Sequence, residues 1–490
     1  MGTDGLRYVC LSDLHLGAQN SVLSAIGDDD VTVDPTRTSE VMALLFAGLR
    51  RLVDHLGPDA PRPTLVLNGD ILEFALASDD AALMVFERFM DLAFPMDDTP
   101  IFDDRVLYIP GNHDHHLWET ARERQYARYV RDLADEESLK APWHVTPMLK
   151  PDRSIEAEVL TAIVRRRTHR EQVSVAVVYP NLGFVDDETN QAVVFHHGHF
   201  TEPLYRLMST LQRDLFPSQT PGPAIWDWEA DNFAWIDFFW SALGRSGVVG
   251  SDVGALYVML QRPDALDWLA GNLSRAVTGR YGPTWASPIS APLLRRTLMF
   301  ALGRATPLER AHVTEPLSPR SEQGLDDYLS GPLLHQLLAE EHGHLDGPDR
   351  PVSSDRALTF VFGHTHKPCE RIATPDGWKQ PVKVLNTGGW VVDTVEPIEV
   401  QGAAIVLVGH DLDAVSLRLF TERADGPAAP VSVAEPDLGP SDAPSAWCQR
   451  VRDALSADEA GWAAFSRAAD EAVTHRHGAL TKIIDHAMRA

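Results

Sequence analysis

The stretch that decides the fold is "LRYVCLSDLHLG", residues 6–17. Its apolar run, Tyr8 to Leu11, is followed at once by Asp13 and His15. A short run that is apolar throughout, rather than at alternate positions, is typical of a strand covered on both faces. The carboxylate and the imidazole therefore stand where a buried strand ends, and both can bind a metal ion.

Similar apolar runs recur along the chain and predict further strands. Between the first three runs lie helical patterns: one begins after Ser39, a suitable N-cap, and ends at Gly57, and the next follows Ser78 and two acids. Alternating strands and helices predict a layered α/β fold. The further runs are "TLVLNGD", "RVLYIPGN", "AVVFHHG", "LTFVFGH", "VKVLNTGG" and "AAIVLVGHD".

Composition indicates which partners to expect and in which compartment the protein lies. The formal charge of −27 would repel a phosphate backbone, so we expect no nucleic-acid partner. Three scattered cysteines form no disulfide framework, and the N-terminus leaves no room for a signal peptide, so we expect a cytoplasmic protein. The most apolar stretch is broken by charges and predicts no transmembrane segment, while peripheral membrane contact and the oligomeric state stay open.

Composition also divides the chain. Proline-rich sequence after Phe420 predicts a linker, and the helical pattern after it predicts an extension that packs on the body or mediates self-association. We expect a core at 5–200 and 355–420, a mainly helical insertion at 201–354, a linker at 421–445 and a helical extension at 446–490.

The predicted insertion is rich in aromatic residues. Tryptophans at this density favour a core within the insertion over a ligand groove, because large aromatic side chains dominate buried area. Six of the twelve tryptophans lie there: Trp226, Trp228, Trp235, Trp240, Trp268 and Trp285.

Five of the predicted strands end in side chains that can bind a metal. Ligands of α/β sheets gather beyond the carboxyl ends of strands, so we expect the five loops to meet at one edge of the sheet. In an extended segment residues i and i+2 project to one side, which would pair Asp13 with His15 and His364 with His366. Carboxylate, amide and imidazole donors without thiolate suit Mn²⁺, Fe or Zn²⁺. Each motif alone is weak, and their order strengthens the prediction.

The series D-x-H, G-D-x-x-E, G-N-H-D, H-G-H and G-H-T-H resembles the calcineurin-like metallophosphoesterase superfamily. The resemblance implies a layered α/β/β/α sandwich and two divalent metal ions. It covers the strand-bearing core and leaves out the insertion and the extension. It implies a first metal on Asp13, His15 and His366, a bridging Asp70, and a second metal on Asn112, His197 and His364.

The resemblance also implies a catalytic histidine, His113, and an acid that orients its ring, Glu73. The alternatives are a pocket-lining histidine and a solvated acid in the first turn of a helix. Strand geometry places His199 on the side of His197, near substrate, and His196 on the opposite face.

The chemistry that the resemblance implies is phosphoester hydrolysis by in-line attack of a metal-bridging hydroxide. The substrate would be a phosphodiester, pyrophosphate or phosphomonoester, small or lipid-linked. "GDILEFA" lacks the arginine of the protein-phosphatase branch, whereas "LSDLHLG" and "GDILEF" resemble the UDP-2,3-diacylglucosamine pyrophosphatases. That branch commonly has arginine where this chain has His113. A non-catalytic, metal-stabilised interaction protein that uses the aromatic insertion is the alternative of another class.

Overall fold

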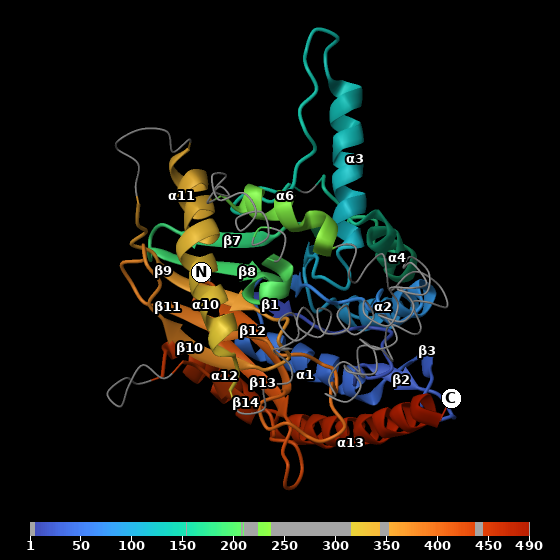
Figure 1. Cartoon of the computed structure of the whole chain (residues 1–490). Coiled ribbons are helices and arrows are strands. Elements are labelled where there is room, and N and C mark those ends of the chain that lie inside the picture. Colours follow the sequence, from blue (N-terminus) through green and yellow to red (C-terminus); the bar gives the residue numbers. More distant parts are fainter. Residues whose placement is uncertain are drawn as a thin grey trace, which may run out of the picture.

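Two β-sheets packed face to face form the centre of the computed structural model (Figure 1). The structure describes residues 5–152, 154–206, 209, 224–236, 315–343, 352–436 and 444–489. The first sheet has the order β14-β13-β12-β1-β4-β5-β6 and the second the order β10-β11-β9-β8-β7. In the first sheet β1, β4, β5 and β6 run parallel, and in the second β8, β9 and β11 do.

The bounds of the strands follow. The first sheet contains β1 (Leu6–Leu11), β4 (Thr64–Asn68), β5 (Arg105–Ile109), β6 (Ser174–Val177), β12 (Gly402–Gly409), β13 (Ala414–Thr421) and β14 (Ser432–Ala434). The second contains β7 (Asn181–Asp186), β8 (Gln191–His196), β9 (Ala357–Phe362), β10 (Cys369–Ala373) and β11 (Val382–Asn386). A separate ribbon pairs β2 (Ser24–Ile26) with β3 (Val33–Thr38).

Alternation along each strand explains why both faces are buried. In β1, Val9 and Leu11 belong to the core under the helices, whereas Tyr8 and Cys10 belong to the core between the two sheets. Successive side chains of a strand point to opposite faces, so each strand of the central layers needs apolar residues at nearly every position. The fold is the α/β/β/α sandwich that the sequence predicts.

Helices cover the outer face of each sheet. On the first sheet, α1 (Glu40–Leu56) begins at Ser39, whose hydroxyl accepts from the Met42 N–H at 3.1 Å, and ends at Gly57; both predicted ends are confirmed. Ser78 precedes the next helix but makes no side-chain capping bond. The other helices of this layer are α2 (Asp79–Ala93), α3 (His116–Asp132), α4 (Glu158–Thr168), α12 (Ala446–Ser456) and α13 (Glu459–Arg489).

The second sheet is covered by the described parts of the predicted insertion, and these are helical. They are the short η1 (His199–Thr201) and η2 (Pro203–Arg206), α6 (Ile225–Ile236), α10 (Pro319–Tyr328), the π-turn η5 (Leu329–Leu333) and α11 (Leu334–His342). Trp228 packs with this core, as expected for an aromatic that serves packing. The other insertion tryptophans apart from Trp226 lie outside the described side chains, and the domain division stays a prediction.

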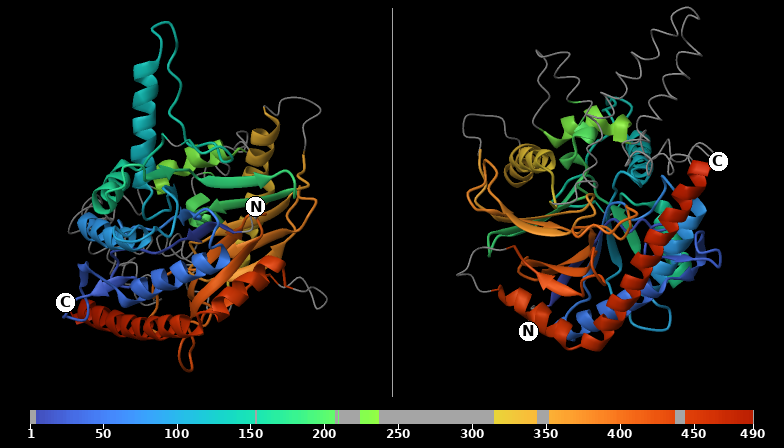
Figure 2. Two further views of the ribbon diagram at one scale, coloured as in Figure 1. Left: turned by 180° about the vertical axis from the view of Figure 1, so that it is seen from behind. Right: turned by 60° about the horizontal axis from the view of Figure 1, so that its bottom comes forward.

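The segment predicted as a linker, 421–445, differs in part from that prediction. Its strand β14 pairs with β13 and extends the first sheet by one edge strand. Proline content alone does not separate a linker from an edge strand, since prolines flank β14 outside its hydrogen-bonded residues. After it, α12 and α13 run back along the helices of the first sheet (Figure 2).

Helix α13 anchors the loops that follow β1 and β11. The Arg476 guanidinium is buried and donates to the carbonyl oxygens of Ser21 at 2.9 Å and Ser24 at 2.6 Å. His477, next along the helix, pairs through Nδ1 with the Thr394 carbonyl oxygen at 2.8 Å. The last helix thus holds two segments that are more than 350 residues apart in the sequence.

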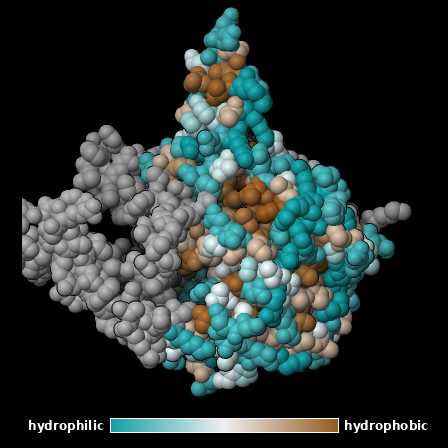
Figure 3. Space-filling model, turned by 90° about the vertical axis from the view of Figure 1, so that its right-hand side faces the viewer, coloured by the Kyte–Doolittle hydropathy of each residue, from teal (hydrophilic) through white to brown (hydrophobic). Residues whose placement is uncertain are grey.

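None of the described helices combines the length and the hydropathy that a bilayer-crossing segment needs. One face is mostly hydrophilic with apolar side chains gathered in places, including on a projecting arm (Figure 3). That arm is α3 and the chain after it, which rise from the body of the molecule (Figure 1).

We expect Arg476→Met to lower the free energy of unfolding by about 2 kcal/mol, because it removes the charged donor that two buried carbonyl groups share. Urea denaturation of the full chain measures this change. The matched control is Arg467→Met, an exposed arginine of the same helix, which should change stability by about 0.5 kcal/mol or less. Equal stabilities of the two variants would contradict the anchoring role.

Candidate metal centre

Five loops from both sheets converge on one buried cluster of polar side chains. Those after β1, β4 and β5 come from the first sheet, and those after β8 and β9 come from the second. The expectation of a single sheet edge was therefore wrong: the cluster lies where edges of two sheets meet. All the side chains predicted as ligands are buried: Asp13, His15, Asp70, Asn112, His197, His364 and His366.

Three overlapping groups of these residues can each hold a cation. One joins Asp13, His15 and His366, and another joins Asp70, His197 and His364. A third joins His15 and Asp70 with His113, which the sequence assigns to catalysis. The donor atoms within each group lie within 4.8 Å of one another. Asp70 belongs to two of the groups, as a ligand that bridges two ions would.

In the first group, carboxylates fix the orientation of two imidazoles. His15 Nδ1 lies 2.7 Å from Glu73 Oε2, and His366 Nδ1 lies 2.5 Å from Asp393 Oδ2. Each Nδ1 therefore carries the proton, and each Nε2 presents a lone pair. The two Nε2 atoms are 3.2 Å apart. Two lone pairs at this distance repel unless a cation lies between them.

The second group has the same construction. His197 Nε2 lies 3.0 Å from Asn112 Oδ1 and 3.2 Å from His364 Nδ1. Asp70 Oδ2, 3.3 Å from the same Nε2, is buried and makes no hydrogen bond. On the far side of the His364 ring, Nε2 lies 3.3 Å from Glu202 Oε1. A carboxylate thus stands behind a ligand here too.

This donor set fits divalent cations. It supplies carboxylate and amide oxygens and imidazole nitrogens that point into the cluster. Few hydrogen-bond donors face these atoms. The described cysteines are buried and outside the cluster, so these groups suit Mn²⁺, Fe or Zn²⁺ rather than a thiolate site.

His113 and Glu73 form the part of the cluster that the sequence predicts for catalysis. Glu73 Oε1 lies 2.8 Å from His113 Nδ1 while its Oε2 serves His15. One carboxylate therefore orients a predicted catalytic ring and a predicted ligand ring together. The opposite nitrogen of His113, Nε2, lies 4.0 Å from Asp70 Oδ2, at the edge of the cation sites.

The comparisons agree with this geometry. Residues 6–240 match the model of the calcineurin-like phosphoesterase family. The chain therefore contains a calcineurin-like phosphoesterase domain. No curated protein matches the chain. His364 and His366 lie beyond the matched residues, yet the fold returns them to the same cluster.

Backbone strain marks the loops of this calcineurin-like phosphoesterase domain. Non-glycine residues rarely adopt the left-handed conformation, and strain of this kind gathers at functional sites. The expected reason for pairing i with i+2 was an extended strand, and this reason was wrong, since the residues lie past the strand ends. Positive φ angles occur at Asp13 (51°), His15 (45°), Asp70 (51°), His364 (71°) and His366 (57°).

Glycines beside the cluster leave room for the ligand side chains. A Cβ at Gly69 would meet the His197 ring, and one at Gly363 would meet the Asp13 carboxylate. Gly389, from the "NTGGW" turn, lies against the His366 ring in the same way. These positions require glycine because a ligand occupies the space of its missing side chain.

The other two histidines near β8 have different environments. His199 is buried, and its ring centroid lies 5.9 Å from that of His197, outside the three cation groups. His196 accepts from the Gly198 N–H through Nδ1 at 2.8 Å and faces the core. The predicted substrate contact of His199 stays a prediction.

Sequence reasoning missed two of the three carboxylates that support the cluster; the third, Asp114, belongs to the G-N-H-D motif. Asp393 and Glu202 stand behind His366 and His364. Asp114 accepts from the Tyr108 hydroxyl and from the N–H groups of Ile71 and Gly111, which fixes the loops of Asp70 and Asn112. For Glu202 the sequence signal was an acid a few residues after a metal motif, and acids are common in loops; Asp393 is far from any motif.

Electrostatics of the cluster favour cation binding in exchange for protons. Burial opposes the charge of His197, but the carboxylates of Asp70, Asp13 and Asp114 raise its pKa to about 9. Burial also opposes ionisation of Asp70, yet the neighbouring imidazoles, His197 first, hold its pKa well below the usual value. Without a cation, protons on the histidines balance the acids.

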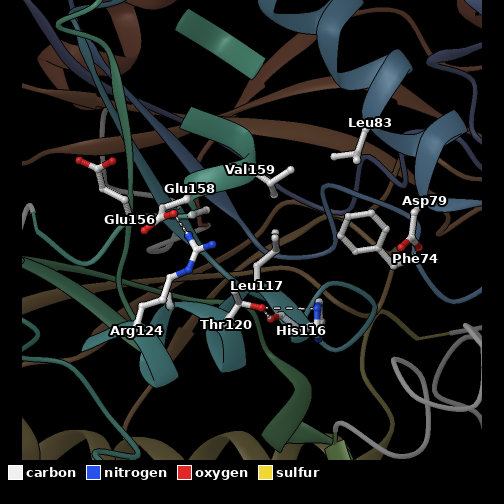
Figure 4. Close-up of a pocket in the computed structure, with 12 residues that line it drawn as sticks. Phe74, Asp79, Leu83, His116, Leu117, Thr120, Arg124, Glu156, Glu158 and Val159 are labelled. Carbon is white, nitrogen blue, oxygen red and sulfur yellow. Dashed lines mark hydrogen bonds and ion pairs between the residues drawn. The ribbon is translucent and has the colours of Figure 1, made fainter. Parts of the chain in front are cut away.

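A pocket of about 240 Å³ opens next to the Glu73 loop, between the starts of α2, α3 and α4 (Figure 4). Phe74 and His116 line it, and Arg124 pairs there with Glu158. His115, by contrast, is buried and lies 3.1 Å from the Tyr179 hydroxyl through Nε2. Of these two neighbouring histidines, His116 thus faces the pocket and His115 faces the core.

We expect Asp393→Asn to weaken cation binding at the first group by about 10- to 100-fold, because the amide no longer fixes the ring of His366 as a carboxylate does. Calorimetric titration of Mn²⁺ into metal-free protein measures this loss. Asp413→Asn, at a carboxylate that pairs with Lys383 in β11, is the control and should bind as wild type. Unchanged affinity in Asp393→Asn would contradict its supporting role.

We also expect Mn²⁺ affinity to rise with pH up to about 9. Below that pH the metal-free His197 is protonated, so a cation must displace its proton, and the cost of doing so falls as pH rises. Titrations in two buffers of different ionisation enthalpy report the protons released. An affinity that stays constant between about pH 6.5 and pH 9 would contradict this expectation.

Proposed function

We propose that the chain is a phosphoester hydrolase that uses two divalent cations, with Asp70 between them. The observation that carries the proposal is the pair of inward-facing, close-packed donor groups, each backed by carboxylates. The calcineurin-like phosphoesterase domain supports a hydrolase acting on phosphoesters. We propose Asp13, His15 and His366 as ligands of one ion, Asn112, His197 and His364 as ligands of the other, and Asp70 as their bridge.

Cations bound there would lower the pKa of a water molecule, clamp phosphoryl oxygens and stabilise the charge of an in-line displacement. The chain's own residues hold these groups in place. Asp13 accepts from the His364 N–H at 2.9 Å, and Asp70 Oδ1 accepts from the His113 N–H at 2.8 Å. Asp70 keeps its Oδ2 for the site. Asp13 Oδ2 accepts from the Ser12 hydroxyl, and Asp13 Oδ1 also lies 3.5 Å from His366 Nε2, so the loops and the ligands fix one another.

We assign the proton transfer to His113. Glu73 accepts from Nδ1–H, and this directs Nε2 toward the space beside Asp70. There the ring can donate a proton to the departing alkoxide. Burial opposes the charge of Glu73, but the His113 and His15 rings lower its pKa, so it stays ionised and supports a protonated imidazole.

The substrate that we propose is a small or lipid-linked phosphodiester or pyrophosphate, with Mn²⁺ as a suitable metal and the cytoplasm as the compartment. A net charge of −27 supports a partner other than nucleic acid. The resemblance of "LSDLHLG" and "GDILEF" supports a UDP-sugar-lipid pyrophosphatase-like reaction as the second candidate. A non-catalytic interaction protein is the alternative, and the carboxylate-held His113 counts against it.

We expect the protein with Mn²⁺ to hydrolyse bis-p-nitrophenyl phosphate, and His113→Ala to lower kcat by about 100-fold or more while metal content is retained. Release of p-nitrophenol and elemental analysis measure the two quantities. His116→Ala, which alters the neighbouring pocket, serves as the control.

Two results would contradict this assignment. Loss of one metal equivalent in His113→Ala would make His113 a ligand, a role that its distance from Asp70 permits. Wild-type activity in the variant would remove it from catalysis.

A further inference from the structure

Buried polar groups without hydrogen bonds lie where insertion helix α6 meets the core. Glu229 of α6 is closed off from solvent, and the Tyr179 hydroxyl is the polar group that acts on its carboxyl group, so at least one carboxyl oxygen is left without a hydrogen-bond partner. An unsatisfied buried polar group costs about 1–3 kcal/mol, and folded proteins keep few of them. Such a group calls for an explanation beyond packing.

His199 is a second group of this kind, contributed by the core. Its side chain is fully buried, and both ring nitrogens are without partners. The ring lies 5.9 Å from that of the proposed ligand His197 and stacks on that of Tyr179 at 6.4 Å, measured between centroids. These unsatisfied nitrogens therefore lie beside the second cation site.

Tyr179 connects the two groups. Burial, and after it the charge of the adjacent Glu229, raise the pKa of the Tyr179 hydroxyl, so the carboxyl group lies next to that hydroxyl. Glu229 also acts on Tyr328, whose hydroxyl bonds to Asn181. From α6 to the second cation site there is thus a row of polar groups: Glu229, Tyr179 and His199.

We propose that Glu229 and His199 form a recognition subsite for a hydroxyl-rich group, a sugar or another polyol, esterified to the phosphoryl group of the substrate. This inference rests on the proposed phosphoester hydrolysis. It states which ester group on the reacting phosphorus the insertion would recognise. The metal ligands do not determine that group.

The chemistry of the subsite matches hydroxyl groups. Burial raises the pKa of Glu229 well above its usual value, which favours the protonated carboxyl group, with one donor and one acceptor. The His199 ring adds two nitrogen atoms without hydrogen-bond partners, and every hydroxyl of a polyol can both donate and accept. A quaternary ammonium group would instead require an ionised carboxylate and would make no hydrogen bonds.

The position of α6 allows a ligand to reach these groups. The helix lies between α11 and the base of α3 (Figures 1 and 2). Its described contacts include ring contacts of Trp228 with Phe200 and of Phe233 with His115, at centroid distances of 5.8 Å and 5.2 Å. A ligand would enter by displacing α6 from these rings, and its hydroxyl groups would then satisfy the polar atoms that the closed arrangement leaves unpaired.

Three p-nitrophenyl diesters that differ in one ester group test this proposal with the full-length protein and Mn²⁺. The probes carry a propyl group, a glyceryl group with the same three-carbon chain and two added hydroxyls, or a choline group. We expect wild type to favour the glyceryl ester over the propyl ester by about tenfold in kcat/KM.

Two substitutions at one position separate hydrogen bonding from packing. Glu229→Leu should bring the glyceryl-to-propyl ratio of kcat/KM close to one. Its melting temperature should match or exceed that of wild type, because the substitution removes unsatisfied polar atoms. Glu229→Gln should keep most of the ratio, since an amide both donates and accepts. Asp227→Leu, a partly exposed acid on another side of the helix, is the matched control and should keep the wild-type ratio.

The outcomes separate this inference from the proposed function. If wild type hydrolyses none of the diesters, the proposed function fails. If wild type hydrolyses them with a ratio near one, or if Glu229→Leu keeps the wild-type ratio, the subsite fails and the hydrolase stands. A preference for the choline ester that Glu229→Gln abolishes would also overturn the polyol subsite, by showing a cation site.

Discussion

The interaction on which the rest of the structure depends is the mutual repulsion of donor atoms packed at the meeting edge of two sheets. Nitrogen lone pairs of His15 and His366 stand 3.2 Å apart, and a buried oxygen of Asp70 faces the second group without a hydrogen bond. Such an arrangement is stable only when positive charge lies among the donors, as protons or as cations. The backing carboxylates, the glycines and the left-handed loops all serve to hold these atoms close.

Most of the central strands and the metal-binding residues could be predicted from the sequence, because each strand is marked by its own apolar run. Every apolar run proposed as a strand is one, and the donors stand directly after them. The strands that were missed include β7 and β10, which lie at the edges of the second sheet and carry half-buried residues. An edge strand needs fewer apolar residues, so its pattern is weaker.

The residues that support the metal ligands could not be predicted from the sequence, for a different reason. Asp393 lies 27 residues beyond His366, and nothing in the spacing joins them, since the fold alone brings the carboxylate to the ring. The same holds for Arg476, which reaches the loop after Asp13 from the last helix. Contacts between distant segments depend on topology, whereas the sequence pattern reports only the strand and its immediate ends. For the same reason, the sequence did not show that the five ligand loops come from two sheets instead of one.

The two kinds of buried polar side chain described here call for different explanations. Arg476 has carbonyl partners that satisfy it, so its burial serves the anchoring of α13 and with it the loops near the cluster. His199 is buried beside the same cluster with both ring nitrogens unpaired, and Glu229, which acts on Tyr179, keeps at least one carboxyl oxygen without a partner. Folding alone would favour apolar residues at both positions, since an apolar side chain there would leave nothing unsatisfied. Polar atoms kept at a cost to stability next to a reactive centre therefore indicate a role in what that centre binds.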